Sequence, residues 1–96
     1  MGRRSFENVW DAIEENPEDA ARVKMRSHLL IAIERKVRGW NVTQGVAARR
    51  LGITRPRLND LLRGKITKFS IDTLIDLAGK ADLRVKMQIK NIAKVA

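Results

Sequence analysis

The sequence predicts a mainly α-helical fold of five helices, followed by one β-strand near the C-terminal end. Two observations carry this prediction. Apolar residues recur at helical spacing through most of the chain, between Ser or Thr N-cap candidates and Gly stop signals. Residues 83–90 instead alternate apolar and polar without exception, which is typical of a half-buried strand. A length of 96 residues allows one small domain.

Composition excludes several classes of protein. The chain is 44% hydrophobic and therefore globular rather than disordered. It has no Cys and a single His, His28, so we expect no disulfide, no metal site and no cofactor. No apolar run approaches the roughly 20 residues that span a bilayer, and no secretion signal follows Met1. We therefore expect a cytoplasmic protein with no membrane contact.

The positive charge is concentrated in one part of the sequence. The chain holds 20 Lys and Arg against 11 Asp and Glu, a net charge of +9. Residues 1–21 hold two basic and six acidic side chains, whereas residues 49–68 hold seven basic side chains and only one acidic side chain, Asp60. Clustered cations are what phosphate contacts require, so this distribution favours a nucleic-acid partner over a merely basic protein.

The first two helices are expected on either side of Asn16. Residues 1–15 form an arm or a short amphipathic helix capped by Ser5. Asn16 and Pro17 then supply an N-cap and a first helical residue, followed by acidic side chains. This helix should run to about Arg38, with Gly39 as a left-handed stop. His28 should lie at the edge of its buried stripe or in solvent. The expected buried stripe comprises Met25, Leu29, Leu30, Ile33 and Val37.

Residues 43–64 predict two short helices joined by a tight turn. Thr43 can cap a helix that begins at Gln44, and Gly52 can end it because glycine accepts a positive φ. Thr54 can cap the next helix, which Gly64 closes. This arrangement is a helix-turn-helix, the motif within a domain expected over residues 16–82. The inward side chains of the second helix are Leu58, Leu61 and Leu62.

The outward face of the second motif helix indicates a function. Its side chains are mostly Arg and Asn, which can bind guanine and adenine through paired hydrogen bonds in the major groove. An ordinary helical hairpin in a basic protein is the alternative, but its solvated face would interleave Lys with Glu. The outward residues are Arg55, Arg57, Asn59, Asp60 and Arg63.

The run from Thr43 to Lys65 resembles the Cro/cI-type (XRE) helix-turn-helix, with Thr43-Gln44 at the first helix and Leu51-Gly52-Ile53 at the turn. Gly45 departs from the family pattern, which usually has a helix former there. Residues 8–13, 24–27 and 69–74 resemble a subfamily of small regulators. Many of these are HigA-like antitoxins encoded beside a RelE/HigB-type toxin.

The resemblance implies roles for individual residues. Residues near base edges would be Arg55, Arg57, Asn59 and Asp60, and residues near phosphates would be Gln44, Lys65 and Lys68. We also expect phosphate contacts from Thr43, Thr54 and Arg63, because helix N-termini and flanking cations attract phosphate. For Asp60, an ion pair within the helix to Arg57 or Arg63 is the favoured alternative.

The C-terminal third should add one helix and the strand. Ser70 can cap a helix that ends near Gly79 or Ala81, with Phe69 packed on Leu74. Residues 83–96 then form a strand and tail. A lone strand needs a partner, and a symmetry mate would give an antiparallel ribbon in a homodimer. Pairing with the N-terminal arm of the same chain is the alternative. The expected dimerisation residues are Leu83, Val85, Met87 and Ile89.

Together these patterns predict a sequence-specific repressor that binds double-stranded DNA as a homodimer. The resemblance adds an antitoxin that represses its own operon. The alternatives are a protein whose main role is to neutralise a RelE/HigB-type toxin and a phage-like repressor with no toxin. We do not expect an enzyme, because the sequence has no paired-carboxylate pocket signal, nucleophile elbow or glycine-rich phosphate loop. Four aromatic residues give no stacking platform for single-stranded RNA.

Overall fold

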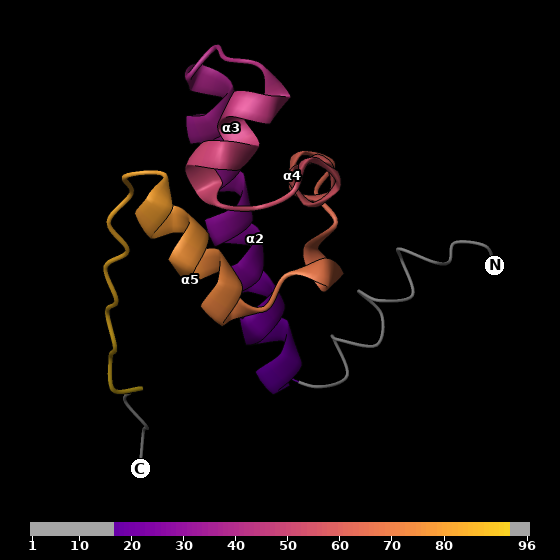
Figure 1. Ribbon diagram of the computed structural model, residues 1–96. Coiled ribbons are helices and arrows are strands. Elements are labelled where there is room, and N and C mark those ends of the chain that lie inside the picture. Colours follow the sequence, from indigo (N-terminus) through magenta and orange to yellow (C-terminus); the bar gives the residue numbers. More distant parts are fainter. Residues whose placement is uncertain (1–16, 93–96) are drawn as a thin grey trace, which may run out of the picture.

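The computed structural model describes residues 17–92 and contains four α-helices and one short 3-10 helix. These are α2 (Pro17–Gly39), α3 (Gln44–Leu51), α4 (Arg55–Leu62), η1 (Ile66–Lys68) and α5 (Ile71–Lys80) (Figure 1). The predicted mainly helical class is confirmed. The fifth helix expected over residues 5–15 lies outside the described residues, so the count of five is not supported.

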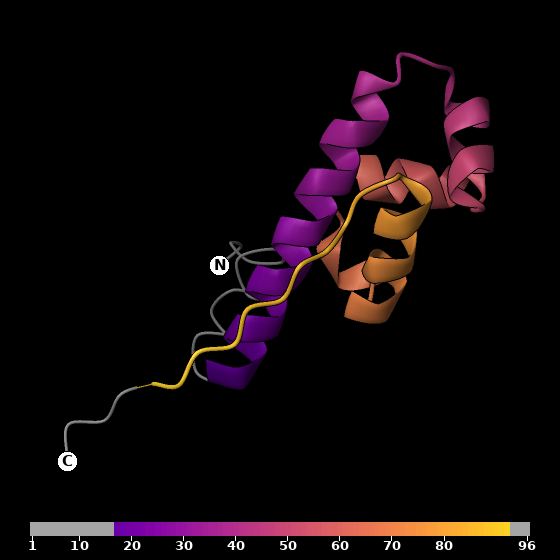
Figure 2. The ribbon, with the colours of Figure 1, turned by 90° about the vertical axis from the view of Figure 1, so that its left-hand side faces the viewer.

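The long helix α2 supports the rest of the described chain. The helices α4 and α5 pack against one side of α2, whereas α3 packs against α4 and α5, as Figure 2 shows. The core between them is almost entirely aliphatic, with one aromatic ring, that of Phe69. Its most deeply buried large side chains are Ile33, Leu51, Leu58, Leu61, Phe69 and Leu74.

The structure corrects two details of α2. Met25 was expected in the buried stripe but is 46% exposed, whereas Val23 is buried. The reason is that Met25 lies on the face of α2 that borders a surface groove rather than the core. Gly39 was expected to be left-handed, but α2 continues through Gly39 and Asn41 has the positive φ, 58°. Asn tolerates this conformation better than most residues.

The predicted start of α5 is confirmed. Ser70 Oγ accepts a hydrogen bond from the Thr73 backbone N–H at 3.1 Å. Phe69 precedes this cap and is buried together with Leu74, which joins the start of α5 to the core. The helix ends at Lys80, and Ala81 follows as its C-cap. Burial of Leu74 and Leu77 then explains why α5 packs against α2.

The C-terminal segment differs from its prediction. Residues 84–92 are extended but form no strand, and within the described chain they make no backbone–backbone hydrogen bond. The last such bond joins the N–H of Leu83 to the carbonyl of Ala78 at 2.8 Å. The strand expected over residues 83–90 is therefore wrong for the single chain. A strand exists only when a neighbouring strand supplies hydrogen-bond partners, and one copy of residues 17–92 offers none.

Two features are absent from the described residues. None of the helices between residues 17 and 92 is long and apolar enough to cross a membrane. Nor do those residues bring together three or more His, Asp or Glu side chains that could hold a metal ion.

Candidate nucleic-acid interface

The helix-turn-helix is built by local hydrogen bonds that the sequence predicts. Thr43 Oγ1 accepts from the Val46 N–H at 3.3 Å and so caps α3. Gly52 then adopts a φ of 70°, which allows its N–H and that of Ile53 to close onto carbonyls of α3. Thr54 Oγ1 accepts from the Arg57 N–H at 3.2 Å and caps α4. Both predicted helix starts and the glycine turn are confirmed.

Small and aliphatic side chains fix the angle between the two motif helices. Ala47, Ala48 and Leu51 are buried on α3, and Leu58 and Leu61 are buried on α4. In Figure 1, α4 is seen end-on beside α3, so the two helices cross steeply. Ala48 allows this close approach, as its size predicts. The crossing leaves the other face of α4 at the surface of the molecule.

The N-terminal ends of the two motif helices lie close together. A methyl group added at Gly45 would lie 3.0 Å from a terminal nitrogen of the Arg55 guanidinium. The side chain of Arg55 therefore reaches back from the first residue of α4 to the first turn of α3. Thr43, Gln44 and Thr54 are exposed beside it. These residues form one surface with two helix N-termini and a guanidinium, which is favourable for a phosphate group.

Arg57 occupies a different environment from Arg55. Its guanidinium donates a hydrogen bond to the carbonyl of Lys68 at 2.9 Å. The same group lies over the ring of Phe69, 4.2 Å from the centroid. Arg57 is half-buried, whereas Arg55 and Arg63 are exposed. Of the four residues expected near base edges, Arg57 is thus turned toward the segment that follows α4.

Asp60 contacts the lysines that were expected at phosphates. Its carboxylate lies 3.5 Å from Lys65 Nζ and 3.7 Å from Lys68 Nζ. This arrangement replaces the intrahelical pair with Arg57 or Arg63 that the sequence favoured. The backbone adds a third link, because the Lys65 N–H donates to the Asp60 carbonyl at 3.0 Å. The residues after α4 are therefore folded back onto the helix.

Asn59 and Arg63 complete the outward face of α4. Asn59 is half-buried and Arg63 is exposed, one turn apart on the helix. Neither side chain takes part in a hydrogen bond or ion pair among the described residues. Together with Arg55 they give α4 a free polar face that carries two positive charges and no negative charge.

Two arginines that sequence reasoning did not single out also shape the interface. The guanidinium of Arg38 donates to the carbonyl of Leu62 at 3.2 Å and pairs with Glu34 at 2.9 Å. It thereby joins the end of α4 to α2. The guanidinium of Arg50 lies over the ring of Trp40 at 4.9 Å. The four-residue spacing of Glu34 and Arg38 could have indicated the first contact. Nothing in the sequence pattern indicates the second.

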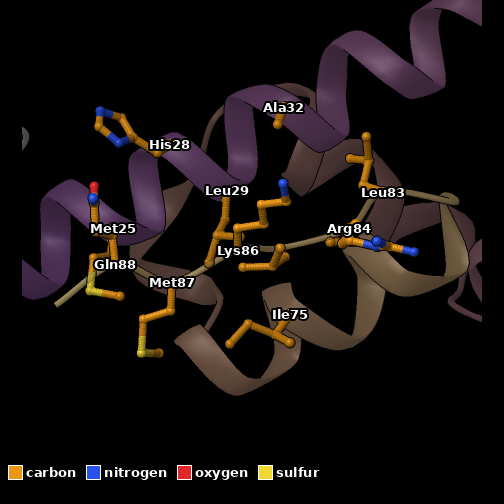
Figure 3. Close-up of a pocket in the computed structure, with 12 residues that line it drawn as sticks. Met25, His28, Leu29, Ala32, Ile75, Leu83, Arg84, Lys86, Met87 and Gln88 are labelled. Carbon is orange, nitrogen blue, oxygen red and sulfur yellow. The ribbon is translucent and has the colours of Figure 1, made fainter.

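Three of the four expected dimerisation residues, Leu83, Val85 and Met87, line a groove of about 440 Å³ between α2, α5 and the C-terminal segment. Figure 3 shows that Met25 and Leu29 of α2, Ile75 of α5 and Met87 border it. Leu83 packs against the core. Exposure then rises along the segment, from 45% at Val85 to 72% at Met87 and 84% at Ile89. His28 is exposed at the rim, in line with its predicted position.

Comparison with known proteins agrees with this geometry. A family model described as a helix-turn-helix domain matches residues 12–90. One similar solved structure is described as a "Putative XRE Family Transcriptional Regulator". It is 28% identical, has a TM-score of 0.70, and the match covers 81% of this chain and 98% of the other. None of the curated proteins compared with the chain matches it. With its capped helices, glycine turn and fold shared with an XRE-type regulator, the chain belongs to the helix-turn-helix domain family.

Proposed function

We propose that the protein is a sequence-specific DNA-binding transcriptional regulator that inserts α4 into the major groove. The observation that carries the proposal is the free polar face of α4, held at the surface by α3 and the glycine turn. Arg55 and Asn59 are our candidates for base contacts, since Arg and Asn match guanine and adenine edges. The family and the fold are typical of DNA-binding regulators, which supports the proposal.

Phosphate contacts would surround the inserted helix. The exposed N-terminal ends of α3 and α4 offer backbone N–H groups beside Thr43, Gln44 and Thr54. Lys65 and Lys68, whose side chains are exposed, flank the other end of α4 together with Arg63. Contacts at both ends of α4 would fix its register on the duplex, while base contacts between them would supply specificity.

A homodimer would deliver two copies of α4 to one operator. Residues 84–92 combine unused backbone hydrogen-bonding groups with exposed apolar side chains, and they border an apolar groove on the same molecule. Pairing this segment with its copy across a two-fold axis would satisfy both features. Two major-groove contacts on one face of DNA would then lie about 34 Å apart.

The direct test is selection of bound duplexes from random DNA by the full-length protein. We expect enrichment of a pseudo-palindrome, with affinity for it at least about 10³-fold above that for random DNA. Binding to both should weaken as salt rises, because phosphate contacts release counterions. Equal affinity for all sequences after several rounds of selection would contradict sequence-specific regulation.

Toxin neutralisation is the second candidate function. It is supported by the acidic sequence of residues 1–21, which is opposite in sign to the basic remainder and would suit a basic partner. Its test is co-purification with the product of an adjacent small reading frame. If co-expression of this protein restores growth of cells that produce that product, the result would support an autoregulating antitoxin. If growth is not restored, a repressor with no toxin partner would be supported instead.

A further inference from the structure

We infer that Arg57 is a positioning residue, which holds the Lys65–Lys68 segment in place for DNA phosphates instead of contacting a base. This inference rests on the proposed DNA-binding function and refines it. It concerns the one arginine of α4 whose guanidinium donates a hydrogen bond within the described chain. Three observations support it.

The first observation is the hydrogen bond from the Arg57 guanidinium to the Lys68 carbonyl at 2.9 Å. It spans eleven residues and fixes the main chain at the position from which the Lys68 side chain projects. A bond from a charged donor to a carbonyl is stronger than one between neutral groups. A base contact by Arg57 would require this bond to break.

The second observation is the contact between Arg57 and Phe69. The guanidinium lies 4.2 Å from the centroid of a ring that is only 1% exposed. Cation–π contact of this kind is favourable, and the planar guanidinium also covers the ring from solvent. Withdrawal of Arg57 toward DNA would lose this contact and open one face of the ring to water.

The third observation is that a second residue of α4 holds the same segment independently. The Asp60 carboxylate lies 3.5 Å and 3.7 Å from the ammonium groups of Lys65 and Lys68. Arg57 therefore fixes the main chain of the segment, while Asp60 gathers its side chains. The side chains of Lys65 and Lys68 remain 44% and 54% exposed, which leaves them accessible to a phosphate.

Arg55 provides the matched comparison. It lies two residues earlier on the same helix and carries the same charge, but its guanidinium extends over the first turn of α3 at Gly45. Among residues 17–92 its guanidinium donates no hydrogen bond and makes no ion pair that would hold it there. Arg55 can therefore turn toward a base without breaking the fold, whereas Arg57 cannot.

The test measures affinity for the selected operator and for random DNA of equal length, using full-length Arg57→Gln, Arg55→Gln and the parent protein. We expect Arg57→Gln to weaken both complexes alike, by about three- to tenfold, without changing the preferred base at any position. Arg55→Gln should relax one base pair in each half-site. A relaxed base pair with Arg57→Gln would overturn the inference and leave the proposed function intact.

The second arm asks whether Arg57 acts through the lysines. In a Lys65→Ala/Lys68→Ala background, Arg57→Gln should cause less than about a twofold further loss, because the groups that it positions are gone. An undiminished loss in that background would also overturn the inference. Failure of the parent protein to bind any DNA would instead refute the proposed function.

A DNA-free measurement separates positioning from unfolding. Amide hydrogen exchange in the free Arg57→Gln protein should accelerate at Lys68 and Phe69, whose N–H groups are bonded within the segment. Exchange at buried residues of α2 should stay unchanged. Unchanged exchange in the segment would contradict positioning, even if DNA binding were weakened.

Discussion

The helix-turn-helix forms within a single chain, whereas the C-terminal segment does not form a strand there. In residues 43–64 each helix end has a cap, and most apolar side chains pack in or against the core of the same molecule. In residues 84–92 the pattern of apolar side chains is equally regular, yet the described chain offers no partner for the backbone. A period-two pattern of apolar residues shows which side chains of a strand would share a face, but the strand forms only if another strand pairs with it. Capping residues and a helical period, in contrast, predict a helix that forms from its own residues.

The largest expected effect tests whether the helix-turn-helix is stabilised by packing within a single chain. Leu58→Ala should lower the free energy of unfolding by about 2–5 kcal/mol, because the side chain is fully buried between α4 and its neighbours. Chemical denaturation followed by circular dichroism measures it. Ile89→Ala is the matched control, since Ile89 is 84% exposed, and it should change the monomer's stability by less than about 0.5 kcal/mol. Equal losses of unfolding free energy in the two variants would contradict the difference between the two regions.

The second prediction concerns what the C-terminal segment is for. Met87→Lys should shift the protein from dimer to monomer in analytical ultracentrifugation, because it places a charge within the proposed ribbon. A chain that ends after Leu83 should behave alike. Leu83 is retained because it packs on the core and its N–H bonds to Ala78. Operator affinity should fall by about 10²-fold or more as two half-sites are uncoupled.

The control for this prediction is Asp72→Lys, a charge change at an exposed residue in the first turn of α5 that does not line the groove. It should leave the dimer intact. A Met87→Lys protein that remains dimeric at micromolar concentration would refute the ribbon, and the exposed apolar residues would then need a different partner.

These two regions also show what the sequence could predict. Thr43, Thr54 and Ser70 were identifiable as caps because a cap depends on residues three positions away. The left-handed Gly52 was identifiable for the same reason. Interactions across longer separations were not identifiable. Arg57 contacts Lys68 eleven residues away, and Arg38 contacts Leu62 across 24 residues. Their exact partners depend on how the helices pack.

The candidate interface shows the same division. Its location and basic character followed from residues 43–68 alone. The different contacts of its side chains did not, since the sequence pattern only placed Arg55, Arg57 and Asp60 together on the outward face of the helix. Only the segment folded back after α4 distinguishes them, by bonding Arg57 and Asp60 and leaving Arg55 free. The helical period predicts the direction in which each side chain leaves the helix axis. It does not predict which of these side chains a later loop will contact.

A third prediction concerns base recognition within the helix-turn-helix. Asn59→Ala should cost about 1–3 kcal/mol at one base pair of each half-site if its amide binds an adenine. The measurement is affinity for operator variants with every base in turn at that position. Lys65→Ala is the control and should weaken all variants alike, with a salt slope lower by about 1. Uniform loss from Asn59→Ala would exclude a base contact.

The smallest expected effect comes from Gly45, the residue that departs from the family pattern. Gly45→Ala should raise the free energy of unfolding by up to about 1 kcal/mol, because alanine favours helix over glycine. The new methyl group would lie 3.0 Å from the Arg55 guanidinium, a flexible group that can move aside. Gly52→Ala is the matched control. With a φ of 70° it should destabilise the protein by about 1–2 kcal/mol.

Because Gly45→Ala would displace the Arg55 side chain, this substitution can also be tested by its effect on DNA binding. If Arg55 contacts a base, Gly45→Ala should alter affinity at that base pair and at no other. A more stable protein with unchanged operator preference would mean that Arg55 leaves Gly45 before it binds DNA. A less stable Gly45→Ala protein would mean that the guanidinium cannot move, and that its position over α3 is part of the fold.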